Sequence, residues 1–135
     1  MTQEEKDLLL KDLCARLPYG VKMNHIADDE HSPKTLIGVA KDMITLKGLG
    51  GYECVDIEHY KPYLFPLSSM TDAQREELDK YLDMDSKSLI DGYKNGLRYA
   101  HPYFNVQDWY NKNHFDYRGL IPMGLVNDAT GKNIY

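Results

Sequence analysis

The spacing of leucines near the start of the chain constrains the fold most, because it sets a helical period that the next segment does not continue. Leu9, Leu13 and Leu17 recur every four residues and predict one apolar stripe on a helix over about residues 3–16. Over residues 21–65, short apolar and β-branched runs are separated by turn residues, a pattern typical of strands. A helix followed by short strands predicts an α+β fold.

Local signals mark where the helices begin and end. Thr2 and Glu5 have the spacing of a capping box, in which each side chain satisfies the other residue's free backbone N–H, and Pro18 ends the helix that they start. Thr71 and Gln74 repeat the capping pattern further along. A second helix, with Leu78 and Leu82 on its buried side, is therefore expected to follow.

The middle of the chain predicts four or five short antiparallel strands. Lys41-Asp42 and the glycine-rich run 48–51 read as turns between them, and Pro62 and Pro66 confine the last strand to an edge or an irregular path. Such a meander could curl into a small SH3-like barrel or remain an open sheet. The predicted strands are 21–26, 35–40, 43–47, 52–57 and 60–65.

The last 50 residues favour helices packed on this sheet. Residues 88–100 suggest a weak helix, or a helix followed by a strand, and Asn105 can cap a short helix that carries Trp109. The chain contains no internal repeat, low-complexity tract or linker. Residues 1–135 are therefore expected to form a single domain.

The charge balance argues against general binding to nucleic acid. The chain carries a net charge of −5, but residues 1–85 hold 10 basic and 17 acidic side chains, whereas residues 86–135 hold 6 and 4. Binding to a phosphate backbone needs a basic surface. Only local contact between nucleic acid and the C-terminal part stays open.

Composition favours a cytoplasmic protein. No run approaches the 18 apolar residues of a membrane-spanning helix, and the start lacks the basic and apolar regions of a signal peptide. Cys14 and Cys54 form no C-x-x-C pair, which suits a reducing compartment. We expect both cysteines to be small core residues.

Two short segments suggest ligand binding but are better explained as loops. Residues 25–31 hold two histidines and three acidic side chains, yet their spacing matches no established metal site. The glycines of residues 48–51 lack the Lys-Ser/Thr of a phosphate-binding loop and are followed by a strand. We therefore predict no metal and no cofactor.

Residues 111–120 carry the densest chemistry. His114 and Asp116 could act as a base and its orienting carboxylate, and Arg118 could bind an anion. No serine or cysteine stands at a recognisable nucleophile position. In the structural alternative, which we favour, the buried aspartate pairs an arginine and the histidine caps a helix end.

Aromatic side chains gather in the same part of the chain. Nine of the fifteen lie between Tyr93 and Tyr135, and six of those nine are tyrosines. Tyrosine is common at protein interfaces, although a chain with three phenylalanines and one tryptophan also needs tyrosines in its core. The candidate binding residues are Trp109, Tyr110, His114, Asp116, Tyr117 and Arg118.

Three phrases resemble a known group of proteins: LCARLPYGV at 13–21, YKPYLFPLSSMT at 60–71 and HFDYRGLI at 114–121. Together they resemble a widespread group of small uncharacterised proteins encoded by gut-bacterial genomes, their prophages and phages. That group often has a charged pair where Pro122-Met123 stands here. The resemblance implies a phage or mobile-element setting and brings no activity or catalytic residue.

These observations predict a non-enzymatic accessory protein that binds a host or phage protein. One alternative is a hydrolase or transferase that uses His114, Asp116 and Arg118. Another is a small nucleic-acid-binding protein that uses stacked tyrosines and basic side chains of the last 50 residues, namely Lys94, Arg98, Lys112 and Arg118.

Overall fold

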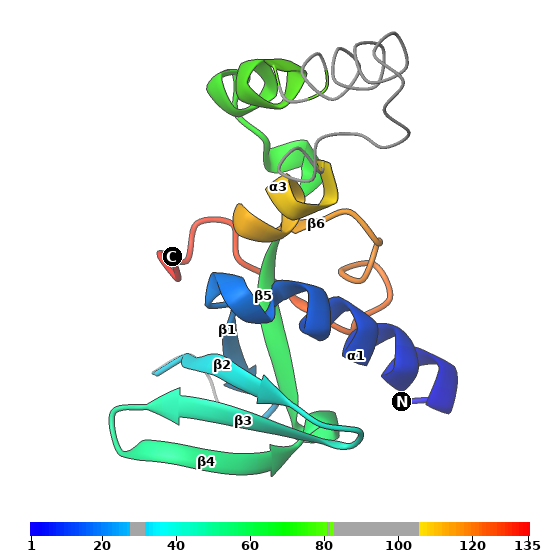
Figure 1. Ribbon diagram of the computed structural model, residues 1–135, viewed down its shortest axis with the longest axis vertical. Helices are drawn as coiled ribbons and strands as arrows, with labels where there is room; N and C mark the ends of the chain where they lie inside the picture. The colour runs from blue at the N-terminus through cyan, green and yellow to red at the C-terminus, as the bar shows by residue number, and fades with distance from the viewer. Residues whose placement is uncertain (28–31, 81, 83–105) are drawn as a thin grey trace, which may run out of the picture.

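Helix α1 and one face of a mixed sheet enclose the main core of the protein. The computed structural model describes residues 1–27, 32–80, 82 and 106–135. Figure 1 shows α1 above strands β2 to β4, with a second group of helices at the far end of β5. The helices and strands are α1 (Gln3–Arg16), β1 (Lys22–His25), β2 (Lys34–Val39), β3 (Met43–Gly48), β4 (Gly51–Asp56), β5 (Tyr60–Pro66), α3 (Val106–Lys112), β6 (Phe115–Asp116) and β7 (Asn127–Asp128). Residues 72–80 are also helical.

The predicted caps of α1 are confirmed. The Thr2 hydroxyl accepts a hydrogen bond from the Glu5 N–H at 3.1 Å, and the Glu5 carboxylate accepts one from the Thr2 N–H at 2.8 Å. Leu17–Tyr19 form a short 3-10 turn after the helix, and Gly20 follows with φ 66°. This left-handed conformation favours glycine, and it turns the chain into β1.

The sheet confirms the predicted antiparallel meander and extends it. Its strand order is β4-β3-β2-β1-β5-β6, and β7, which lies outside this order, also pairs with β5. β1 to β5 pair antiparallel, whereas β6 and β7 run parallel to β5. Among the described strands the order ends at β4 and β6, so the sheet is open and does not close into an SH3-like barrel.

The fifth strand was predicted to take an edge or an irregular path, and the edge position is wrong, because β5 lies inside the sheet. Its two prolines are tolerated because β5 changes partners along its length. Tyr60–Pro62 pair with β1, and the following residues pair with β7 and then with β6. In this register each residue of β5 faces a partner on one side only, so a proline nitrogen can face the side without a ladder.

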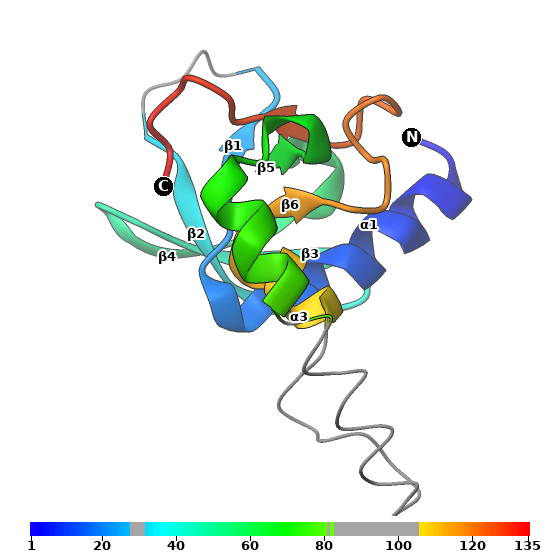
Figure 2. The ribbon, with the colours of Figure 1, turned by 90° about the horizontal axis from the view of Figure 1, so that it is seen from above.

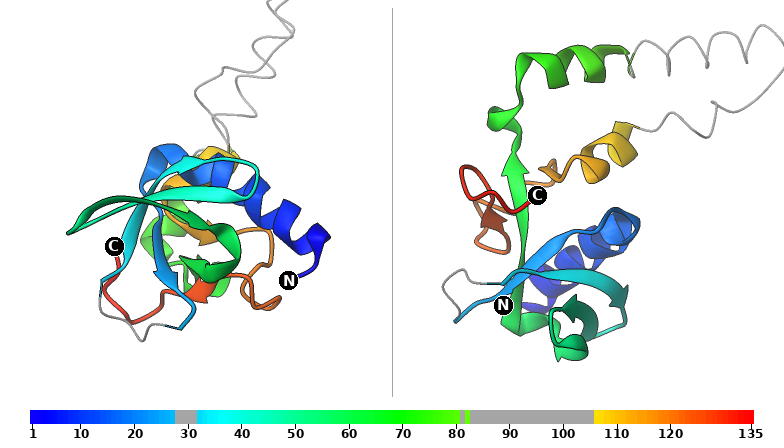
Figure 3. Two further views of the ribbon diagram at one scale, coloured as in Figure 1. Left: turned by 90° about the horizontal axis from the view of Figure 1, so that it is seen from below. Right: turned by 90° about the vertical axis from the view of Figure 1, so that its left-hand side faces the viewer.

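The core has two parts that meet along β5. The larger part lies between α1 and the sheet and includes Leu9, Leu13 and Leu64, all fully buried. The smaller part consists of Leu78, Trp109 and Phe115 and joins helix 72–80 to α3. Figures 2 and 3 show helix 72–80 and α3 close to each other at the end of β5 remote from the β3–β4 hairpin.

Three side chains that were expected in the core are exposed: Cys14, Cys54 and Leu82. On α1 the buried stripe runs through Leu9, Asp12, Leu13 and Arg16, and Cys14 lies on another side of the helix. Cys54 lies on the face of β4 that points away from the core. Both corrections follow from helical and strand periodicity once the buried face is known.

Some predictions fall on residues outside the described ranges. They include the helix at 88–100, the cap at Asn105, the aromatic side chains from Tyr93 to Phe104, and most of the loop at 25–31. Within the described ranges, no helix has both the length and the apolar character needed to cross a membrane.

Candidate functional site

The residues predicted to carry chemistry follow α3 in an irregular path, of which only Phe115–Asp116 form a strand. His114 follows α3 with φ 61°, a left-handed conformation that is uncommon for a residue other than glycine. Its carbonyl accepts a hydrogen bond from the Phe65 N–H at 2.8 Å, which fixes the start of β6 against β5. A regularly extended backbone would place His114, Asp116 and Arg118 on one side, but this irregular path gives the three side chains separate contacts.

Asp116 holds the loop that follows β6. Asp116 is 6% exposed, and its two carboxylate oxygens accept hydrogen bonds from the backbone N–H groups of Leu120 and Ile121, each at 2.9 Å. Nδ1 of His114 has no hydrogen-bond partner within the described residues. The proposed pairing of a base with an orienting carboxylate therefore has no hydrogen bond at Nδ1, and Asp116 serves the backbone instead.

Arg118 pairs with a buried aspartate, as in the structural alternative, but that aspartate is Asp12 of α1. The Arg118 Nε lies 3.1 Å from one carboxylate oxygen of Asp12, and the Arg16 Nε lies 2.7 Å from the other. Arg16 also donates to the Phe115 carbonyl at 2.7 Å. Asp12 and Arg16 are fully buried, so two guanidinium groups share one carboxylate between α1 and the C-terminal segment.

Sequence reasoning missed Asp12 and Arg16, although a signal was present. Both residues follow Leu9 and Leu13 on the same helical stripe, so the stripe contains a charged pair with i,i+4 spacing. Such a pair on a solvated face is ordinary, but a pair within an apolar stripe must find further partners inside the protein. Here the partners are Arg118 and a backbone carbonyl.

The aromatic candidates are mostly structural. Trp109 is 3% exposed and stacks on Phe115 with ring centroids 5.7 Å apart. The Tyr117 ring receives the guanidinium groups of Arg16 and Arg118 at 5.4 and 4.9 Å, and it stacks on Tyr110 at 5.4 Å. Trp109 therefore fills the smaller part of the core, while the Tyr117 ring packs against the two arginines that bind Asp12.

Tyr135 joins β1 to β5 through its hydroxyl group. The hydroxyl accepts from the Lys22 N–H at 2.9 Å and donates to the Tyr63 carbonyl at 2.7 Å. The β1–β5 ladder ends at the pair Met23–Pro62, and the hydroxyl bridges Lys22 and Tyr63, the residues that come next on each strand. The segment 127–135 thus supplies both β7 and this bridge.

The ring of Tyr135 covers the His114 imidazole, with the two centroids 3.7 Å apart. Burial lowers the pKa of His114 to about 4, and the positive charges of Arg16 and Lys22 act in the same direction. Burial also raises the pKa of the Tyr135 hydroxyl. The imidazole is thus neutral at pH 7 and stacked on a ring, which suits a packing role.

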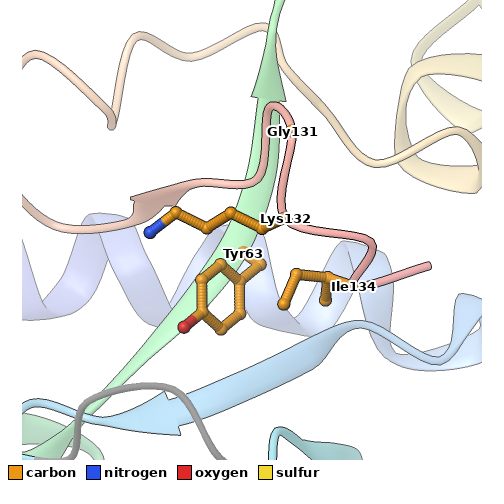
Figure 4. A pocket seen from close by; sticks show the side chains of 4 residues that line it. All are labelled: Tyr63, Gly131, Lys132 and Ile134. Carbon is orange, nitrogen blue, oxygen red and sulfur yellow. The ribbon is translucent and has the colours of Figure 1, made fainter.

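A cavity of about 300 Å³ lies beside this bridge and is lined by Tyr63, Gly131, Lys132 and Ile134 (Figure 4). The Lys132 ammonium lies 5.8 Å from the centre of the Tyr63 ring. This cavity offers one cation and one aromatic face. No group of three or more metal-ligating side chains gathers in the described part of the chain.

The remaining candidate is the outer sheet face, which we define as the side of β2–β4 that points away from α1. Strand alternation shows which side chains lie on this face. Ile44 and Leu46 of β3 point into the core, so Met43, Thr45 and Lys47 point outward. Their partners on β4 are Asp56, Cys54 and Tyr52, and Ile37 adds an exposed apolar side chain from β2.

A bulge between Leu36 and Gly38 adds one residue, Ile37, to the outer sheet face. The register between β2 and β3 shifts from Leu36 to Gly38, and both Ile37 and Gly38 face the same side. A Cβ atom at Gly38 would lie 3.2 Å from the Thr45 Cβ, so glycine allows the two strands to approach here. Figure 3, left, views the molecule from this side.

Comparison with known proteins found no match: no family model, no curated protein and no solved structure is similar to this chain. Function must therefore be argued from the arrangement of its side chains.

Proposed function

We propose that the chain is a non-enzymatic, cytoplasmic accessory protein of a phage or mobile element, and that it binds a host or phage protein through the outer sheet face. The exposure of apolar side chains on that face carries the proposal. Ile37, Met43 and Tyr52 are 41%, 39% and 69% exposed, and Leu49 at the adjoining hairpin tip is 101% exposed. Aromatic side chains and methionine are enriched at protein interfaces relative to the rest of the surface.

The composition of the outer sheet face suits a protein partner. Tyr52 presents a large ring, and the Lys47 ammonium lies 5.7 Å from the centre of that ring. An aromatic anchor with a neighbouring cation is typical of interface hot spots. The partner we expect is a folded protein or an extended segment with apolar side chains and some negative charge.

The contacts of the C-terminal segment support a non-enzymatic function. The groups that a hydrolase or transferase would need are engaged in the fold: Asp116 by backbone N–H groups, Arg118 by Asp12, and His114 by the Tyr135 ring. Arg118 is also one of the cations that nucleic-acid binding would use. The outer sheet face, by contrast, presents exposed apolar side chains that can contact a partner.

Site-specific photo-crosslinking tests the proposal with a matched control. A photo-reactive amino acid replaces either Met43 on the outer sheet face or Met123, a methionine elsewhere that is 45% exposed against 39% for Met43. Irradiation of cells of the natural host, followed by mass spectrometry, should give one adduct species from position 43 and none of that species from position 123. Equal yields of one species from both positions would contradict the proposal.

Measuring the dissociation constant of each variant then checks that the crosslinked protein is a binding partner. With the purified partner, Met43→Ala should raise the dissociation constant about tenfold, as expected when an interface side chain worth about 1.4 kcal/mol is truncated. Met123→Ala should change it less than about twofold. Equal affinities for both variants and the unmodified protein would remove the outer sheet face as the binding site.

A further inference from the structure

We infer that β4 is an interface for a second copy of this chain, so that two protomers form one continuous sheet about a two-fold axis at Cys54. Among the described strands β4 forms a free edge of the sheet, whereas the proposed function uses the outer sheet face.

The two edges of the sheet differ in how well they are protected. β6, at one end of the strand order, consists of two residues only. β4, at the other end, has six residues, Gly51–Asp56, and contains neither lysine nor proline. Edge strands of monomeric proteins are usually short or carry such residues, because unpaired backbone groups invite another strand.

The phase of the β3–β4 ladder shows which backbone groups of β4 face outward. The two-residue turn closes on the pair Gly48–Gly51, so hydrogen-bonded pairs recur at every second residue from there. The Ile57 N–H donates to the Asp42 carbonyl at 3.2 Å, which continues that phase beyond the strand. The N–H and C=O groups of Tyr52, Cys54 and Asp56 therefore point away from β3.

One antiparallel register uses all of these groups. If Cys54 faces the partner's Cys54, then Tyr52 faces the partner's Asp56, and the three pairs form six N–H···O=C bonds. Sliding the strands so that Tyr52 faces the partner's Cys54 would place two Glu53 carboxylates opposite each other. Like charges directly opposite each other destabilise a sheet, so the two-fold axis at Cys54 is favoured.

The charges along the edge are self-complementary in this register. On the outer side, the Lys47 ammonium lies over the Tyr52 ring. In the proposed register Tyr52 stands between Lys47 on β3 and the partner's Asp56, so the cation and the carboxylate lie on the same face of the continuous sheet. On the inner side, Glu53 faces the partner's Val55, and its carboxylate is already paired with Lys34. No like charges meet directly, and a cation from one chain approaches an anion from the other at both ends.

Light scattering coupled to gel filtration, at up to about 500 µM protein, tests the interface over the range expected for a small, reversible contact. The unmodified chain should shift with concentration from 15.6 kDa toward twice that mass. Cys54→Lys places two ammonium groups at the two-fold axis and should raise the dissociation constant at least about tenfold. Leu49→Lys adds the same charge at the hairpin tip and should leave it unchanged.

Crosslinking verifies the register through the two exposed cysteines. In Cys14→Ser, a short bismaleimide should join two chains through Cys54, whereas in Cys54→Ser it should not join them through Cys14. A chain that stays monomeric over the whole concentration range, or a dimer unaffected by Cys54→Lys, would overturn the inference. Either result would leave the crosslinking test of the proposed function unaffected.

Discussion

The C-terminal segment 106–135 and the outer sheet face differ in what their side chains do. The segment is rich in residues with catalytic potential, yet its aspartate, arginine and histidine are each engaged by the fold. The outer sheet face has few such residues, but its apolar side chains lie in solvent. A reactive side chain therefore indicates function only if it is not already engaged in contacts that hold the fold together. Variants in the segment should reduce stability, and variants on the face should reduce binding.

The largest effect is expected from Asp12→Asn. The substitution leaves Arg16 and Arg118 buried or partly buried without their shared carboxylate, and removing one partner of a buried ion pair costs about 3–5 kcal/mol. The free energy of unfolding in urea measures this loss. Asp7→Asn, on the exposed side of the same helix, should change it by less than about 0.5 kcal/mol. Equal values for the two variants would show that the cluster is not structural.

The pH dependence of stability provides a second test. His114 titrates with a pKa of about 4 in the fold, against 6.5 in the unfolded chain. Between these values the unfolded state binds a proton that the native state does not, so stability is full above pH 6.5 and falls as the pH is lowered. From pH 7.5 to 4.5 the protein should lose about 2–3 kcal/mol more than His114→Asn, which keeps the left-handed backbone. His59→Gln, at an exposed position, should behave like the unmodified protein.

Local patterns predicted the elements of this fold, and distant contacts decided its candidate site. The helix at 3–16 and the strands follow from periodicity, caps and turns within a few residues of each other. Arg118 meets Asp12 across 106 positions, and no spacing rule connects them. The exposure of Cys14 and Cys54 likewise depended on which side of each element the rest of the chain covers. The outer sheet face emerged only from the register of β3 and β4.

The smallest stability effect, and the most specific, is expected from Tyr135→Phe. The change retains the ring over His114 but removes the hydroxyl that bridges the Lys22 N–H and the Tyr63 carbonyl. Leaving these backbone groups without that partner should lower the free energy of unfolding by about 2 kcal/mol. Tyr52→Phe removes the same atom from the outer sheet face and should have almost no effect, because that residue is 69% exposed. If Tyr52→Phe lowered the free energy of unfolding as much as Tyr135→Phe, the Tyr52 hydroxyl would have a structural role. That result would contradict the assignment of Tyr52 to recognition and the contrast between the two regions.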